Sequence, residues 1–133
     1  MPRRASIYPT QAELEILNVL WRRGSSTVRQ VHQTLREDGT THTTLTTTLK
    51  MLQIMVDKRL VRRADTKPHQ YVAAIDQGHT QTGLLDDLVR RAFDGSVHKL
   101  VMRAVEESGL SGEELRNLQQ LIDHMRQQNR GEE

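Results

Sequence analysis

The sequence predicts a mainly α-helical fold with one short β-hairpin, and three observations lead to this prediction. Over most of the chain, apolar residues recur every three or four positions, which is the spacing of one helix face. Two capping boxes, Thr10 with Glu13 and Thr27 with Gln30, mark helix starts near the N-terminus. From Leu60 to about residue 74, β-prone segments replace the helical spacing.

The first two predicted helices are short and closely joined. The first begins at the Thr10 capping box and ends at Gly24, because glycine favours the backbone conformation that terminates helices. The second begins at the Thr27 capping box and ends where Asp38 and Gly39 interrupt the pattern. Their apolar faces consist of Leu14, Leu17 and Trp21 in the first helix and Val28, Val31 and Leu35 in the second.

A third helix is predicted from about His42 to Lys58, where threonines are dense. Seven of the nine residues from Thr40 to Thr48 are threonine, and β-propensity alone would favour a strand. On a helical wheel of about 100° per residue, however, the apolar residues of this segment fall within roughly 40° of Leu45. The stripe consists of Leu45, Leu49, Leu52 and Val56. It favours a helix whose opposite face carries Thr43, Thr47, Lys50 and Ile54.

The threonine content of this helix points to an exposed binding surface. Threonine is a mediocre helix former, because its branched β-carbon crowds the preceding turn. A segment so rich in threonine therefore gives up helix stability for another purpose. A short side chain with a methyl and a hydroxyl group lets the backbone approach a polar, uneven partner, and the major groove of DNA is such a partner.

A basic β-hairpin is predicted after the third helix. Residues 60–64 and 70–74 are β-prone and are separated by the turn-forming residues 65–68. The hairpin carries Arg62, Arg63, Lys67 and His69. Three helices, the third of them exposed, followed by a basic hairpin predict a winged helix-turn-helix DNA-binding domain over residues 1–75.

Residues 76–133 predict three further amphipathic helices that form a dimerisation segment. Ser111 and Glu114 make a capping box for the last of them. Helices this short cannot bury apolar stripes alone, so they must pack on the N-terminal domain or on a second subunit. A homodimer is favoured, and one continuous monomeric core is the alternative. The residues predicted to form the dimer interface are Leu85, Leu88, Val97, Leu100, Val101, Leu115, Leu118, Ile122 and Met125.

Composition and charge predict a soluble cytoplasmic protein with a basic and an acidic part. The first residues lack the apolar segment of a signal peptide, and no apolar run approaches the roughly 18 residues that cross a bilayer. Residues 1–75 hold twelve Lys and Arg against six Asp and Glu, whereas residues 76–133 hold seven against eleven. The basic part is therefore expected to meet a polyanion.

Neither an enzyme nor a cofactor or metal site is predicted. The sequence contains no glycine-rich phosphate loop, no nucleophile elbow and no HExxH motif. It also contains no cysteine, which excludes disulfides and thiolate metal sites. No two histidines are three or four residues apart, so we interpret them as scattered surface residues rather than metal ligands. These histidines are His32, His42, His69, His79, His98 and His124.

Several motifs occur together along the chain. In order, they are PTxxE, LxxLW, TVRQV, TTLTTTLKML, DKRLVRR and HQYVA. In this combination and spacing, the chain resembles the penicillinase-repressor family of winged-helix transcriptional repressors over essentially its whole length. The resemblance implies a homodimeric repressor that binds double-stranded DNA at a palindromic operator, with the C-terminal helices forming the dimer interface.

The resemblance also implies which residues contact DNA, because the family's major-groove helix corresponds to residues 42–50. The predicted DNA-binding residues are His42, Thr43, Thr44, Thr46, Thr47, Lys50, Arg62, Arg63 and Lys67. Thr43, Thr46 and Thr47 are expected to contact base edges or phosphates. Thr44 is expected to contact the DNA backbone, and Lys50 a phosphate. The three hairpin cations are expected to hold the flanking DNA backbone. Arg3, Arg4 and Arg29 are expected to add nonspecific attraction.

Two departures from the family pattern bear on regulation. The β-lactam-responsive members are inactivated by cleavage at an Asn-Phe bond, and the matching pair here is Arg103-Ala104. A sensor protease is therefore an open but disfavoured partner. The copper-responsive relatives use a cysteine cluster, which this chain lacks. The alternative function is a winged-helix protein-interaction module that does not bind DNA. The threonine helix argues against that alternative, because protein interface cores favour aromatic residues, Met and Arg.

Overall fold

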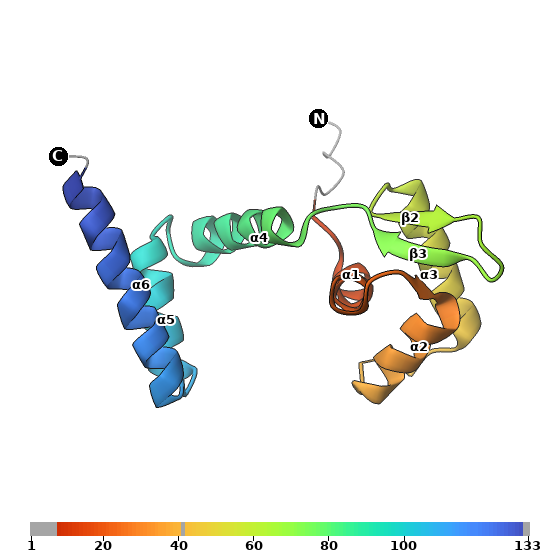
Figure 1. Ribbon diagram of the computed structural model, residues 1–133, viewed down its shortest axis with the longest axis horizontal. Helices are drawn as coiled ribbons and strands as arrows, with labels where there is room; N and C mark the ends of the chain where they lie inside the picture. The colour runs from red at the N-terminus through yellow and green to blue at the C-terminus, as the bar shows by residue number, and fades with distance from the viewer. Residues whose placement is uncertain (1–7, 41, 132–133) are drawn as a thin grey trace. The chain divides into compact units, whose positions relative to one another are not determined.

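The computed structural model describes residues 8–40 and 42–131, so Arg3 and Arg4 lie outside the described residues. The chain is mainly α-helical with a small antiparallel sheet, as predicted (Figure 1). The elements in chain order are α1 (Gln11–Arg23), β1 (Ser26–Thr27), α2 (Val28–Glu37), α3 (Leu45–Asp57), β2 (Val61–Ala64), β3 (Gln70–Ala73), α4 (Gln77–Ala92), α5 (Val97–Glu107) and α6 (Gly112–Gly131).

All three predicted capping boxes are confirmed, including that of Ser111 and Glu114, with both hydrogen bonds at 3.1 Å. The backbone N–H of Thr10 donates to Glu13 Oε1 at 2.9 Å, and the Glu13 N–H donates to Thr10 Oγ1 at 3.2 Å. The same reciprocal pair joins Thr27 and Gln30 at 2.9 and 3.2 Å. At its other end α1 stops at Gly24, which adopts a φ of +82° and donates its N–H to the last turn of the helix. These local signals fix α1 and the start of α2.

The sheet contains one strand that the sequence analysis did not predict. The predicted hairpin forms as β2 and β3, but β1 also pairs with β3, so the strand order is β1-β3-β2. β1 holds only Ser26 and Thr27, which lie opposite Tyr71 and Gln70. Two residues are too few to show the alternation that marks a strand, and Thr27 also caps α2.

A single apolar core joins the three N-terminal helices to the sheet. Its buried residues are Ile16, Leu17, Val19, Leu20, Val31, Leu35, Leu52, Met55, Val61 and Tyr71. Trp21 is half-buried beside this core and donates its indole N–H to the Ile75 carbonyl at 3.1 Å. Three helices around one core, with a β-hairpin directly after the third, are a winged helix-turn-helix, as predicted.

The three predicted C-terminal helices are present as α4, α5 and α6. The chain divides into two compact units between Asp86 and Asp87, inside α4, whereas the sequence analysis divided its two modules after residue 75. The assignment of functions to those modules stays a prediction. Tyr8 packs closely on Gly83 within the first unit, where an added Cβ would lie 2.8 Å from the tyrosine ring. Within the described residues, no helix is long and apolar enough to span a membrane.

Candidate nucleic-acid interface

The threonine-rich segment forms a helix, but the helix begins three residues later than predicted. Thr44 is its N-cap, and its Oγ1 accepts a hydrogen bond from the Thr47 N–H at 3.3 Å. His42 and Thr43 therefore precede α3 instead of forming its first turn. A threonine with an extended backbone is a good N-cap, so Thr44 outcompetes the earlier threonines for the helix start.

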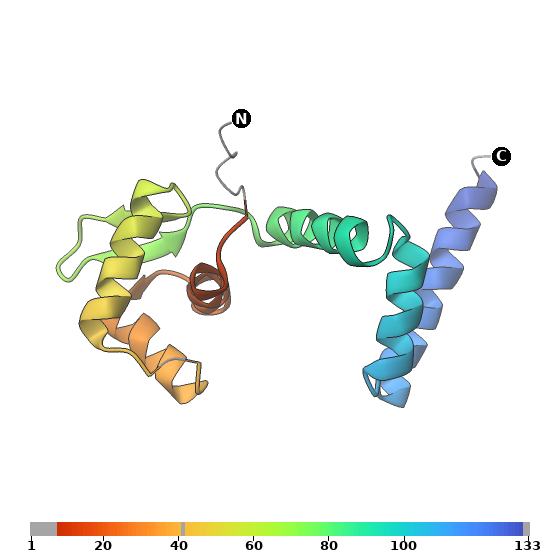
Figure 2. The same ribbon diagram turned by 180° about the vertical axis from the view of Figure 1, so that it is seen from behind.

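The two sides of α3 differ, as the leucine stripe predicts, but of the stripe only Leu52 is fully buried, and Leu45, Leu49 and Val56 are half-buried. Leu52, Met55 and the single inward threonine, Thr48, are buried. Thr46 and Thr47 are exposed on the other side of the helix. Figure 2 shows α3 lying in front of the sheet in that view, so this side of the helix is not covered by the sheet. Short hydroxyl side chains thus occupy an open helix surface.

The exposed side of α3 continues past the threonines. Lys50 is exposed one turn after Thr46, and its ammonium group forms no ion pair with any described residue. Gln53 is exposed on the same side, but the sequence analysis did not single it out. Its position seven residues after Thr46, two helical turns along the same face, is the signal that could have identified it. A glutamine amide can pair with the edge of an adenine.

A buried hydrogen bond anchors the inner side of α3 to α2. His32 Nδ1 lies 2.8 Å from Thr48 Oγ1, and only 9% of His32 is exposed. The interpretation of His32 as a surface histidine is therefore wrong. His32 directly follows Val31 and lies three residues before Leu35, so it shares the buried face of α2. The apolar neighbours Val31 and Leu35 are the sequence signal that could have placed His32 on the buried face of α2.

The β2–β3 hairpin, which is the wing of the winged helix, places Arg62 and Arg63 on opposite faces. Arg63 lies opposite the buried Tyr71 across the β2–β3 pair, so it shares the face that packs on the helices. Arg62 lies opposite Val72 and points to the outer face, because successive residues of a strand alternate. Both arginines are exposed, and so is Lys67 in the connecting turn. The three cations were predicted to act as one group, whereas strand alternation places Arg62 and Arg63 on opposite faces of the hairpin.

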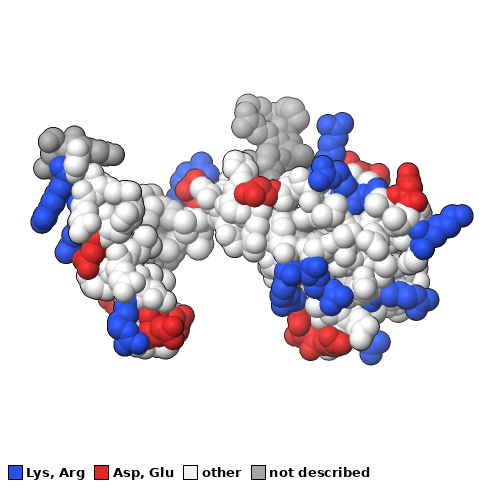
Figure 3. Space-filling model, viewed as in Figure 1, with Lys and Arg blue, Asp and Glu red and all other residues white. Residues whose placement is uncertain are grey.

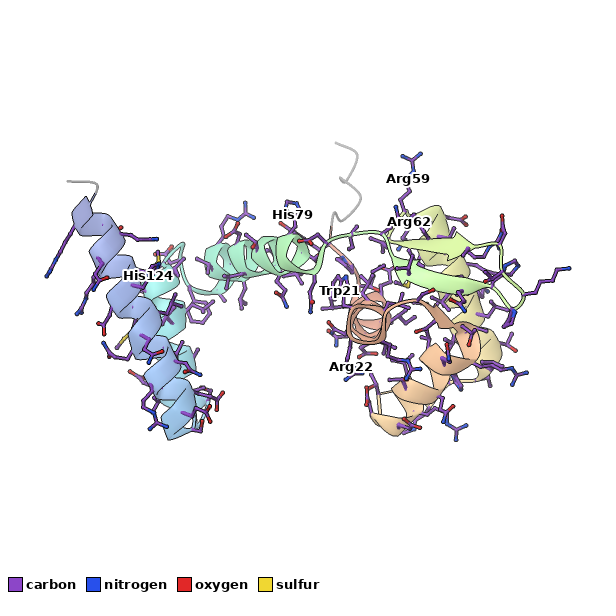
Figure 4. All side chains as sticks on the ribbon, in the orientation of Figure 1. Trp21, Arg22, Arg59, Arg62, His79 and His124 are labelled. Carbon is purple, nitrogen blue, oxygen red and sulfur yellow. The ribbon has the colours of Figure 1, made fainter. Side chains whose placement is uncertain are left out.

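Although they lie on opposite faces of the hairpin, Arg62 and Arg63 both line one open groove. The groove has a volume of about 540 Å³, lies at the end of α3 and is also lined by Arg59. Figure 4 shows Arg59 projecting away from the body of this unit. Arg59 adopts a φ of +66°, which ends α3 and turns the chain into β2.

A basic groove lies between α2 and the segment that leads into α3. It has a volume of about 910 Å³ and is lined by Arg29, His32, Gln33, Arg36, Glu37, His42, Thr43, Thr44 and Leu45. Three of the predicted DNA-contacting residues, His42, Thr43 and Thr44, are thus brought together with Arg29. Figure 3 shows Lys and Arg side chains spread over the visible face of this unit, out to its edge. The groove holds Arg29 and Arg36 against Glu37, and the open side of α3 adds Lys50, so these residues together carry a net positive charge.

The residues predicted for dimerisation are mostly exposed apolar side chains. Eight of the nine residues are between 36% and 53% exposed, and Leu100 is half-buried. The eight are Leu85, Leu88, Val97, Val101, Leu115, Leu118, Ile122 and Met125. Met102, Val105 and Leu121 add to this exposed apolar surface. No residue of α5 is buried, and none of the described part of α6 is buried either.

The pair that matches the cleavage position of the β-lactam-responsive relatives lies on the surface of α5. Arg103 and Ala104 are both exposed, and Arg103 Nη1 lies 3.6 Å from Glu107 Oε1 one turn along the helix. Among the residues that the structure describes, no group of three or more His, Asp or Glu could hold a metal ion.

The chain is similar to known proteins over most of its length. The family model described as penicillinase repressor matches residues 9–124. A penicillinase repressor from Bacillus licheniformis is 26% identical over 120 residues, which cover 86% of this chain and 88% of that protein. The crystal structure of a MarR family transcriptional regulator from Silicibacter pomeroyi DSS aligns with a TM-score of 0.48 and 16% identity, covering 85% of this chain and 65% of that chain, less than two thirds of its length. The chain belongs to the penicillinase repressor family, whose members are transcriptional repressors.

Proposed function

We propose that this transcriptional regulator is a cytoplasmic homodimer that represses by binding a palindromic DNA operator through α3 of each subunit. The proposal rests on the difference between the buried side and the exposed side of α3. Its inner side is anchored in the core and its outer side presents Thr46, Thr47 and Lys50 without cover from the sheet. A rigid helix with small polar side chains on its open face fits the major groove.

The charge distribution supports DNA as the partner. Apart from Arg22, which pairs with Asp38, and Lys58, which pairs with Glu13, the cations of the described winged-helix unit form no ion pair within the described chain. Unpaired cations can neutralise phosphates and release the counterions that condense on DNA. Lys50 and the wing cations would position the domain on the backbone, and the α3 threonines would contact the bases.

The exposed apolar surface of the C-terminal helices supports a homodimer. Contiguous apolar patches on a soluble protein mark sites of interaction, and α5 and the described part of α6 leave their apolar residues exposed. A second copy of the chain offers the same surface, and closed two-fold pairing buries both at once. Two winged helices related by two-fold symmetry would meet half-sites about 34–36 Å apart and block transcription sterically.

The proposal is tested by selecting duplexes from a random pool with the full-length protein. We expect the selected sequences to contain an inverted repeat, and a gel shift should show one discrete complex with it. Binding should weaken steeply between about 50 and 200 mM salt, because several phosphate contacts release counterions. A pool that yields no common sequence, together with no complex at the lower salt, would overturn the proposal in favour of a protein-interaction module.

A further inference from the structure

A buried side-chain hydrogen bond connects the interiors of α2 and α3. It joins His32 Nδ1 to Thr48 Oγ1 at 2.8 Å. Only 9% of His32 and 3% of Thr48 is exposed. The two residues are 16 positions apart and come from the two helices of the helix-turn-helix, so the bond spans the contact between them.

Thr48 is buried, whereas the other threonines of α3, Thr46 and Thr47, are exposed. It directly follows Thr47 on α3, and consecutive helical residues are about 100° apart around the axis. A rotation of α3 that moved Thr48 out of the core would therefore turn the exposed face around Thr46 and Thr47 toward the protein. The placement of Thr48 thus decides which hydroxyls face outward.

Apolar contacts alone define this rotation poorly. Leu52 and Met55 pack on the core through nondirectional contacts, and neighbouring methyl and methylene groups tolerate small turns of the helix. A hydrogen bond requires a donor, an acceptor and an angle, so it favours one rotational setting. Losing one buried partner also leaves the other unsatisfied, which penalises every setting in which the bond is broken.

His32 also lines the basic groove in which Thr43 and Thr44 lie. The ring therefore lies between Thr48 in the interior and the groove that leads to the first turn of α3. One side chain is placed where it can fix the start of the helix and its rotation together.

We infer that His32 is a positioning residue for DNA recognition, which acts through Thr48 to set the rotation of α3 and so aims Thr46 and Thr47 at the bases. The inference rests on the proposed DNA-binding function. It distinguishes His32 from an ordinary core residue, because an ordinary core residue would affect discrimination between DNA sequences only by changing stability.

The experiment compares four full-length variants with the wild type. Thr48→Val removes the hydroxyl, and Thr48→Ser keeps it. His32→Leu combined with Thr48→Val replaces both polar partners with apolar groups, a change that is nearly neutral for stability. Thr34→Val is the matched control, because Thr34 is also buried, at 9% exposed, but its hydroxyl donates within α2, to the Gln30 carbonyl at 2.9 Å.

Three quantities are measured for each variant: affinity for the selected duplex, affinity for random DNA, and amide hydrogen exchange in the first turns of α3. In Thr48→Val and in the double variant, the ratio of the two affinities should fall about tenfold, while random-DNA affinity changes less than about twofold. Exchange at the start of α3 should become about tenfold faster. Thr48→Ser and Thr34→Val should retain the wild-type ratio.

The double variant decides the inference, because it is expected to fold with an unchanged melting temperature even if Thr48→Val does not fold. A double variant that discriminates as well as the wild type would overturn the inference. So would a loss of discrimination in Thr34→Val as large as that in Thr48→Val. If the wild type itself does not discriminate, the proposed function fails instead, and unchanged exchange in the double variant would then separately refute the role of the bond in fixing α3.

Discussion

Lys58 Nζ donates a hydrogen bond to Glu13 Oε2 at 2.8 Å, and this contact joins the end of α3 to the first turn of α1. The Glu13 side chain is 3% exposed, whereas that of Lys58 is 51% exposed. Burial acts to raise the pKa of Glu13. The hydrogen bonds from Lys58 and Thr10 and the charge of Lys58 outweigh burial, so the pKa of Glu13 is lowered below its ordinary value.

Replacing Lys58 with Met should therefore destabilise the protein. The change removes the charged partner of a buried carboxylate, and we expect the free energy of unfolding to fall by about 1–2 kcal/mol, since solvent screens the exposed lysine end. Urea denaturation at neutral pH measures the loss. The matched control is Arg22→Met, which breaks the exposed Arg22–Asp38 pair and should cost less than about 0.5 kcal/mol. Equal losses in the two variants would contradict the special role of Glu13.

The same pair predicts a specific response to acid. Because its folded-state pKa is lowered, ionised Glu13 contributes stability above its unfolded pKa, near 4.5, and this contribution is lost as pH falls through the folded-state pKa. Denaturation series between about pH 2.5 and 7 should show a shallower acid decline in Glu13→Gln than in the wild type. Parallel curves for the two proteins would show that another carboxylate dominates the decline.

The starts of α1, α2 and α6 could be predicted from the sequence because their signals are local. A capping box needs residues only three positions apart, and all three boxes formed where the sequence places them. The Glu13–Lys58 contact joins residues 45 positions apart, and no local pattern marks it. The pairing of β1 with β3 is likewise a product of tertiary structure, as Ser26 has no strand pattern of its own.

The candidate interface likewise combines features that local sequence patterns predict with features that depend on tertiary packing. The leucine stripe predicted that Thr47 and Lys50 are exposed, and it did so because helical periodicity is a local property. It could not show that Thr48 turns inward to a histidine on another helix, since that depends on how α2 packs against α3. A run of identical residues hides such differences, because the sequence alone does not show which threonine has a partner.

Lys50→Ala should weaken binding to specific and random DNA equally. Lys50 has no ion pair among the described residues, and a phosphate contact carries no sequence information. The slope of log affinity against log salt should decrease by about 1 in magnitude, as expected for one lost phosphate contact. Fluorescence anisotropy titrations at several salt concentrations measure this slope. A loss confined to the selected duplex would instead place Lys50 at a base.

Thr47→Ala should reduce discrimination between sequences. Its hydroxyl and methyl groups are exposed on α3, whereas the Thr44 cap can still accept from the residue 47 backbone N–H after the change. We expect specific affinity to fall by about 1–2 kcal/mol with little change in random-DNA affinity. Competition gel shifts with the two duplexes give the ratio, and circular dichroism verifies that α3 still forms. An unchanged ratio would remove Thr47 from the base-contacting set.

Because Arg62 and Arg63 lie on opposite faces of the wing, we expect their replacement by alanine to lower DNA affinity unequally. Arg63 shares the face of the hairpin that is turned toward the helices, and Arg62 points to the outer face. If DNA lies against α3, Arg63→Ala should lower affinity about tenfold at low salt and reduce the salt slope by about 1. Arg62→Ala is the comparison variant and should lower affinity by at most about threefold, because a side chain on the outer face would make a weaker phosphate contact. The reverse order would mean that the outer face of the wing meets the DNA.

The exposed apolar face of α6 predicts that one charge can separate the subunits. Ile122 is 46% exposed, and in a dimer interface Ile122→Glu would bury an unpaired carboxylate. The variant should sediment as a monomer and lose at least about 100-fold in affinity for the selected duplex, because the two half-sites are no longer bound together. Gln120→Glu adds the same charge about 200° away around the helix and should stay dimeric. If Ile122→Glu sediments like the wild type, a different surface holds the subunits together. If the wild type is already a monomer, the exposed stripes have no partner copy to bury them.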